Sequence, residues 1–264
     1  MTQVQFKYFL KLLQKKFRRS ERLFLVEGIH TVEEALASGW RTEALLVAEE
    51  FRGSSLPVEK LVQNALRNSV QAFEISTRQL EKLSETVTSQ GIIGVVHQSQ
   101  QKTGDTWKGK NLVALDGVAD PGNAGTIIRT CDWFGVDTVL LDKNCVELYN
   151  PKVVRATMGS IFHLPILHEL ALPNALMESK AEGFRILVTA LSPEKKPAPK
   201  SFPGRWIIVF GSEAHGVSPE IRRLADEVVT IPRYGDAESL NVAVACGIVL
   251  ATVKAGIPKN LEKS

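Results

Sequence analysis

The sequence predicts an α/β protein whose C-terminal part is built on a parallel sheet. From residue 111 onward, runs of apolar residues without polar alternation are separated by helical patterns. Strands that are apolar on both faces and separated by helices are typical of a parallel sheet covered on both sides. The expected strands are 112–115, 136–141, 185–191, 206–210 and 228–231, and a closing helix is expected over 239–254.

A second, smaller α/β domain is predicted over residues 23–97, where strand-like and helix-like segments alternate. The expected strands are 23–26, 44–48, 70–75 and 92–97, and the expected helices are 31–38, 58–68 and 78–84. Residues 98–106 are polar throughout, which predicts a linker over 98–110 and a C-terminal domain over 111–264. Residues 191–203 hold four prolines and predict an ordered surface loop.

The first 22 residues form a basic arm. They hold seven Lys and Arg residues and one acid, a net charge of +6, whereas the other 242 residues carry a net charge of −3. Phe6, Phe9, Leu10, Leu13 and Phe17 recur at helical spacing, so we expect an amphipathic helix with a docked apolar side and a free basic side. Such a helix favours a polyanionic partner. A solvated helix face is an equal alternative on charge alone, and a membrane-surface helix ranks below both.

Several classes of protein are excluded or disfavoured by composition and by missing motifs. No apolar run approaches the roughly 20 residues of a membrane span, and the N-terminus has no apolar signal core. The three cysteines form no C-x-x-C, which predicts reduced core thiols in a cytoplasmic protein. No G-x-G-x-x-G, phosphate-binding loop or G-x-S-x-G occurs, and the five histidines are scattered, so we expect no metal site.

Three polar segments directly follow predicted strands, at 116–129, 210–219 and 231–243. They hold Asn123, Arg129, Gly211, Glu213, Ser239 and Asn241. Ligands bind at the carboxyl ends of parallel strands, so we expect these segments to form one site. Taken singly, each also has a structural explanation: Asn123 caps a helix that carries an ion-paired Arg129, and Ser239 caps the last helix.

Together these segments resemble the three motifs of the SpoU (TrmH) family of RNA ribose 2′-O-methyltransferases, within the SPOUT class. The sequences DGVADPGNAGTIIRT, FGSEAHGVSP and IPRYGDAESLNVAVACG all fit, and the third is highly specific. The likeness covers residues 112–251 and keeps the order and spacing of the motifs, and RATMGSIFHLPI at 155–166 resembles the middle segment of the family. RLFLVEGIHTVEEAL at 22–36 resembles the RNA-binding substrate domain of the family.

The resemblance implies a deep trefoil knot in the C-terminal domain, a homodimer formed through that domain, and S-adenosylmethionine as the cofactor. It places the cofactor against Gly211, Ile231 and Leu240, largely through main-chain groups. The residues that line the reaction site by resemblance are Asn123, Arg129, Glu213, Ser239 and Asn241. In the family, the residue that matches Arg129 has been proposed as the base that removes the proton from the ribose 2′-hydroxyl. A guanidinium is always protonated, so we expect Arg129 to clamp a phosphate and stabilise the developing alkoxide, with Glu213 positioning it.

Ribosomal RNA is the expected substrate, because a separate N-terminal domain suits a large folded RNA. One alternative is the same chemistry on tRNA. A non-catalytic RNA-binding protein that retains the fold is the other, and the complete set of Asn123, Arg129, Glu213 and Asn241 argues against it.

Overall fold

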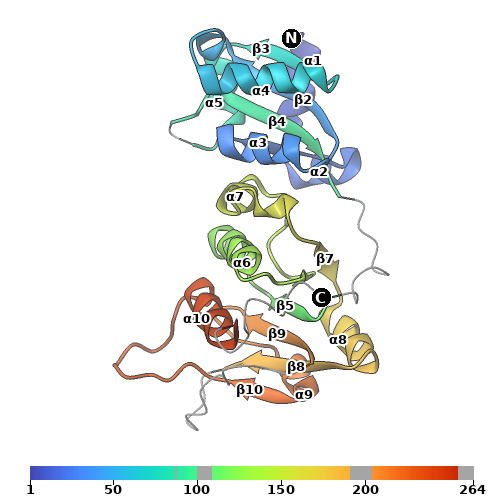
Figure 1. Cartoon of the computed structure of the whole chain (residues 1–264), viewed down its shortest axis with the longest axis vertical. Helices are drawn as coiled ribbons and strands as arrows, with labels where there is room; N and C mark the ends of the chain where they lie inside the picture. Colours follow the sequence, from blue (N-terminus) through green and yellow to red (C-terminus); the bar gives the residue numbers. More distant parts are fainter. Residues whose placement is uncertain (87, 100–108, 191–203, 255–264) are drawn as a thin grey trace. The chain divides into compact units, whose positions relative to one another are not determined.

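The computed structural model describes residues 1–86, 88–99, 109–190 and 204–254 (Figure 1). The chain forms two compact units. The first is Met1–Gln100 together with Glu147–His163, and the second is Gln101–Val146 together with Leu164–Ser264. Most of the predicted linker, at 100–108, and the proline-rich segment at 191–203 lie outside the described residues.

The first unit contains a four-stranded mixed sheet. Its strands, in spatial order, are β1 (Leu23–Glu27), β4 (Ile92–His97), β2 (Thr42–Ala48) and β3 (Gln71–Ile75). Strand β4 runs antiparallel to both of its neighbours, whereas β2 and β3 are parallel. The helices between the strands are α3 (Ile29–Ala37), α4 (Leu56–Arg67) and α5 (Thr77–Leu83), and a short 3₁₀ helix η1 (Glu49–Phe51) precedes α4. The elements predicted for residues 23–97 are therefore confirmed.

The basic arm folds as two helices, α1 (Gln3–Lys11) and α2 (Lys15–Glu21), rather than as one. Its docked apolar side is confirmed, because Phe6, Phe9 and Leu12 are buried in a core cluster with residues of β1 and β2. The prediction of a free basic side is wrong for one residue. Arg18 is only 3% exposed, because its guanidinium has buried partners within the unit.

The segment 147–163 groups with the first unit by its contacts, although it lies inside the C-terminal domain that the sequence predicted over 111–264. It contains α7 (Pro151–Ala156) and the 3₁₀ helix η3 (Ser160–Phe162). Aromatic packing accounts for this placement. The ring of Phe24 in β1 lies 4.8 Å from that of Tyr149 and 6.3 Å from that of Phe162, and Trp40 meets Phe162 edge-on at 5.1 Å.

The second unit is built on six strands, and every neighbouring pair is parallel. In spatial order they are β10 (Glu227–Val229), β8 (Phe184–Thr189), β9 (Arg205–Gly211), β5 (Asn111–Asp116), β6 (Thr138–Asp142) and β7 (Ile166–Leu170). The central strands are buried along nearly their whole length, which confirms the predicted parallel sheet. Strand β7 was not among the strands expected for this sheet, although the stretch from His163 to His168 reads as strand-like.

Helices lie along this sheet in two groups. Residues of α8 (Leu172–Ala181) and α9 (Pro219–Leu224) share a core cluster with the strands, and these two helices pack on each other. Helix α6 (Pro121–Trp133) packs against α10 (Val242–Lys254) (Figure 1). Helix α10 begins at Val242, whereas the sequence predicted a start at Ser239. No helix in the described part of the chain has the length and apolar character needed to cross a bilayer.

The three cysteines are free thiols, and the prediction that they are core residues holds for Cys131 and Cys246, which are fully buried. Cys145 is partly buried, and its Sγ donates to the carbonyl oxygen of Leu115 at 3.1 Å. Burial raises the pKa of Cys145 to about 11, so this thiol stays protonated and unreactive near neutral pH.

Candidate active site

The first two motif segments leave the sheet from neighbouring strands. Asp116, the last residue of β5, pairs in register with Gly211, the last residue of β9. The segment after β5 enters α6, whose N-cap is Asp120 and not Asn123. The Asp120 carboxylate accepts from the main-chain N–H of Asn123 at 2.7 Å. This cap leaves the side chain of Asn123 free for other partners, which corrects the predicted capping role.

Asn123 joins the three motif segments through its side-chain amide. Its Nδ2 donates to Oε1 of Glu213 in the second segment. Its Oδ1 accepts from Nδ2 of Asn241 in the third segment at 2.8 Å. The other end of the Asn241 amide caps α10, because Oδ1 accepts from the N–H groups of Ala243 and Val244 at 2.9 and 3.2 Å. The expectation that the three segments meet is therefore confirmed, and Asn241 takes the capping role that was considered for Ser239.

Gly211 is required by the fold of the second segment. A Cβ atom at this position would lie 2.0 Å from the carbonyl carbon of Gly216, so the backbone would have to shift. The loop folds back on itself because the N–H of Gly216 donates to the carbonyl oxygen of Ser212 at 2.8 Å and Gly216 has a φ of +67°. A glycine at position 211 lets a ligand lie against the backbone, as expected from the sequence. The close approach of Gly216 and Val217 to this position is a second reason for a glycine there.

Asp116 is a site residue that the sequence analysis missed. Its buried carboxylate accepts from the main-chain N–H of Ser218 at 2.7 Å, and Ser218 is the N-cap of α9. A carboxylate at a helix N-terminus is favourable. Asp116 therefore ties the second segment to the end of β5. The signal in the sequence that could have identified Asp116 was an acidic residue at the end of a buried strand.

The second and third segments enclose a cavity of about 510 Å³. Five of the eight predicted site residues line it, namely Gly211, Glu213, Ile231, Ser239 and Leu240. Asn123 and Asn241 do not line the cavity, but they reach it through the hydrogen bond of Asn123 to Glu213. The remaining residue, Arg129, is exposed on α6 and is not part of the lining.

The predicted pairing of Glu213 with Arg129 does not occur in the described part of the chain. Glu213 accepts from Asn123 instead, and the Arg129 guanidinium has no hydrogen bond or ion pair among the described residues. Arg222 of α9 and Arg233 of the third segment also line the cavity, and the sequence analysis named neither. Arg222 lies in a short helix and gave no signal in the sequence. Arg233 lies within the third motif, which could have identified it.

The residues that line the cavity suit an adenosine-like ligand. Its lining includes the apolar residues Phe210, Val229 and Val249, together with Gly211 of the second segment. Pockets of this kind bind flat apolar groups, and a few polar groups fix the orientation. The residues present therefore fit S-adenosylmethionine. Gly211, Ile231 and Leu240 would hold the adenosine part, and Glu213 and Ser239 lie on the same cavity.

Residues 110–251 match the SpoU rRNA Methylase family, and residues 4–94 match the MRM3-like substrate binding domain. The chain belongs to the SpoU rRNA methylase family. It is 36% identical to the 23S rRNA (guanosine(2553)-2′-O)-methyltransferase RlmP of Bacillus subtilis, over 91% of this chain and 92% of RlmP. It is 28% identical to the human mitochondrial rRNA methyltransferase 3, over 89% of this chain and 68% of that protein.

Among solved structures, the AdoMet-bound rRNA methyltransferase from Sinorhizobium meliloti is 28% identical, with a TM-score of 0.83 over 98% of this chain and 97% of that chain. AdoMet is S-adenosylmethionine. Membership of the SpoU family confirms two predictions made from the motifs. The chain is an RNA ribose 2′-O-methyltransferase, and its cofactor is S-adenosylmethionine.

The amide chain through Asn123 leads to a prediction about charge. Asn123→Asp places a carboxylate against that of Glu213, and methyl transfer should fall about tenfold or more, because a charge-assisted hydrogen bond of about 1.5–3 kcal/mol is replaced by repulsion. Adding Glu213→Gln reverses the donor and the acceptor and should restore part of the rate. Single-turnover assays of the two single variants and the double variant measure this. A double variant no faster than the product of the single effects would contradict the role of Asn123 as a positioning residue.

Proposed function

We propose that this chain methylates a ribose 2′-hydroxyl of ribosomal RNA in the cytoplasm. The observation that carries the proposal is that Asn123 joins all three family motifs by hydrogen bonds to Asn241 and to Glu213, and Glu213 lines the cavity. The names of RlmP and of rRNA methyltransferase 3 favour ribosomal RNA over tRNA. Reduced thiols, as predicted for the three cysteines, suit the cytoplasm.

Within this proposal, bound S-adenosylmethionine supplies an electrophilic methyl group on its sulfonium. Gly211, Ile231 and Leu240 bind the cofactor, while Ser239 and Glu213 lie on the same cavity and face the reacting groups. Asn123 and Asn241 fix Glu213 and the start of α10. Arg129 stabilises the negative charge that develops on the ribose 2′ oxygen. The scheme assigns every role to these side chains and main-chain groups, and the prediction that no metal takes part stays a prediction.

A map of 2′-O-methyl groups tests the proposal. Ribosomal RNA and tRNA from cells with and without the protein are compared at every nucleotide, with an Arg129→Ala chain as the control. We expect one site in ribosomal RNA to lose its methyl group without the protein and to stay unmethylated with the variant. A lost site in tRNA alone would favour the second substrate class, and crosslinking to RNA without any lost site would favour a binding protein.

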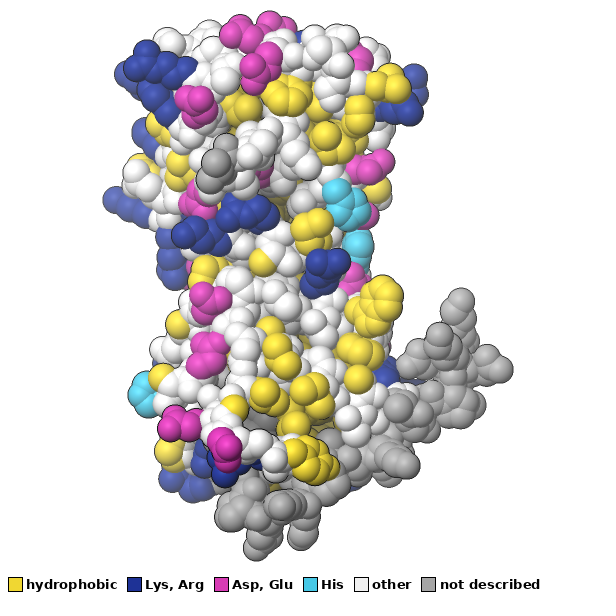
Figure 2. All heavy atoms as spheres, turned by 90° about the vertical axis from the view of Figure 1, so that its left-hand side faces the viewer, with side chains coloured by type: hydrophobic (Ala, Val, Ile, Leu, Met, Phe, Trp, Pro, Cys, Tyr) yellow, Lys and Arg dark blue, Asp and Glu magenta, His cyan; other side chains and the backbone are white. Residues whose placement is uncertain are grey.

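We also propose a homodimer formed through the C-terminal unit. On the face shown in Figure 2, apolar side chains gather over α6 and α10. Trp133 on α6 is 85% exposed, and Val244 and Ile248 on α10 are 52% and 40% exposed. Exposed apolar residues that gather on one face mark interaction sites. Light scattering of the full chain at micromolar concentration should give twice 29.1 kDa, and a Val244→Asp, Ile248→Asp chain should give the mass of one monomer. A monomer for the unmodified chain would refute the dimer.

The finer fold assignment is likewise a proposal. We infer that the C-terminal unit holds the deep trefoil knot of the family, and that the first unit is the substrate domain. The match of residues 4–94 to a substrate binding domain supports the second assignment. The family match over 110–251 and the likeness to the Sinorhizobium meliloti rRNA methyltransferase support the first.

A further inference from the structure

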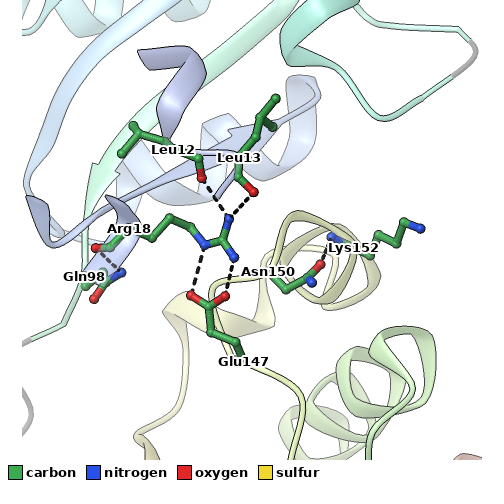
Figure 3. A network of polar contacts seen from close by, with 7 residues as sticks. All are labelled: Leu12, Leu13, Arg18, Gln98, Glu147, Asn150 and Lys152. Carbon is green, nitrogen blue, oxygen red and sulfur yellow. Dashed lines mark hydrogen bonds and ion pairs between the residues drawn. The ribbon is translucent and has the colours of Figure 1, made fainter. Parts of the chain in front are cut away.

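A buried ion pair joins the basic arm to the segment 147–163 within the first unit (Figure 3). Arg18 Nε donates to Oε1 of Glu147 at 3.0 Å, and Arg18 Nη2 contacts Oε2 of the same carboxylate. Arg18 Nη1 donates to the carbonyl oxygens of Leu12 and Leu13, each at 2.8 Å. Gln98 Nε2 donates to the carbonyl oxygen of Arg18 at 2.9 Å. Helix α2 and the start of the segment that carries α7 are thus held together.

Because Arg18 and Glu147 balance each other, Glu21 is the one acid left in α2 and α7 against five Lys and Arg residues. Glu147 is the only acid in residues 147–163, and its charge is already balanced by buried Arg18. Lys15 and Lys16 on α2 and Lys152 on α7 are exposed, and Arg155 on α7 is half-buried. In the described part of the chain, none of these four side chains has an acidic partner. We call these four residues the α2–α7 surface.

We propose that the α2–α7 surface is one phosphate-binding surface for the substrate RNA, so that α7 belongs functionally to the RNA-binding unit. This inference rests on the proposed function. Unpaired exposed cations bind phosphates without reading sequence, and each phosphate contact steepens the dependence of affinity on salt. Lys and Arg side chains gather near α7 on the face shown in Figure 2. The family match of 110–251 includes α7, and the structure assigns this helix to the other unit.

Substitution of single cations tests this surface better than deletion of the arm. Phe6, Phe9 and Leu12 are core residues, so deletion of residues 1–22 would disrupt the unit itself. We would measure the affinity of the full chain for a 12-nucleotide oligouridylate at several salt concentrations. The slope is that of the logarithm of the binding constant against the logarithm of the salt concentration. Lys152→Gln should reduce the magnitude of this slope by about 0.7, and the Lys15→Gln, Lys16→Gln chain should reduce it by about 1.4. In the triple variant the two decreases should add.

Two control variants separate charge from structure. Lys152→Arg keeps the cation and should keep the slope of the unmodified chain. Lys60→Gln removes an exposed lysine from α4 of the same unit and should leave the slope unchanged. An unchanged slope for Lys152→Gln would overturn the role of α7. A decrease of the same size for Lys152→Arg or Lys60→Gln would overturn it too. Neither result would affect the methylation map. Absence of salt-dependent RNA binding by the unmodified chain would overturn both this inference and the RNA-binding part of the proposed function.

Discussion

Arg129→Ala should lower the single-turnover rate of methyl transfer by about 10²–10³-fold and leave the affinity for S-adenosylmethionine near that of the unmodified chain. Arg129 is exposed on α6 and does not line the cavity, so its removal takes no contact from a cofactor held there. A fixed cation beside the ribose 2′ oxygen binds more strongly as negative charge develops on that oxygen. An interaction that is stronger in the transition state than in the ground state raises the rate.

Arg129→Lys should remain well below the unmodified chain, because lysine keeps the charge but loses the planar, two-pronged geometry. Calorimetry with S-adenosylmethionine and single-turnover transfer on the same RNA would measure the two quantities separately. Arg223→Ala is the matched control, since Arg223 is exposed on α9 and does not line the cavity. If the affinity for the cofactor fell in proportion to the rate, or if Arg129→Ala kept its full rate, the assignment of Arg129 to the transition state would be refuted.

Much of the fold could be predicted from the sequence because the strands are apolar on both faces. The burial of β5 and β9 on both sides produces uninterrupted apolar runs, which are the signature of a parallel sheet. The stretch at β7 reads as strand-like, but it was not placed in the sheet, because only its first two residues, Ile166 and Leu167, are buried and the apolar run is short. The mixed order of the first sheet also escaped, since periodicity carries no information about which strands pair.

The assignment of α7 to the first unit depends on contacts between residues far apart in the sequence. Phe24 packs on Tyr149 and Phe162, and no local pattern predicts that pairing. In the sequence, Arg18 resembles the other cations of the basic arm. Its partner Glu147 lies 129 residues away, so no local pattern indicates the ion pair. A long-range ion pair of this kind leaves no trace in local periodicity or in net charge.

The residue types of the candidate site were predicted by motif resemblance, but their hydrogen bonds were not. Asn123 and Asp120 are both good N-cap residues, and Pro121 at the first helical position was the signal that favoured Asp120. The bonds of Asn123 to Glu213 and Asn241 span three segments, so only the folded chain reveals them. Glu213 was expected beside Arg129 because both belong to the motif set, and the structure pairs it with the amide instead.

Arg18→Ala should lower the free energy of unfolding of the first unit by about 3–5 kcal/mol. The Arg18 side chain is 3% exposed and that of Glu147 is 8% exposed, so both charges are largely removed from water. Removal of the guanidinium leaves the Glu147 carboxylate buried without its counterion. It also removes the donors from the carbonyl oxygens of Leu12 and Leu13 at the end of α1. Lys16→Ala on the exposed side of α2 should change the stability by less than about 0.5 kcal/mol.

The comparison of single and double substitutions identifies the cause of this loss. Replacement of both partners, in an Arg18→Met, Glu147→Leu chain, leaves no unpaired charge and should be less destabilising than Arg18→Met alone. The double variant should still have a lower free energy of unfolding than the unmodified chain, because the carbonyl oxygens of Leu12 and Leu13 lose their hydrogen-bond donor. Urea unfolding, with hydrogen exchange of β1 and β4 as the reporter for the first unit, measures these differences. A double variant less stable than Arg18→Met would show that the ion pair itself stabilises the arm, and that an unpaired buried charge is not the main cost.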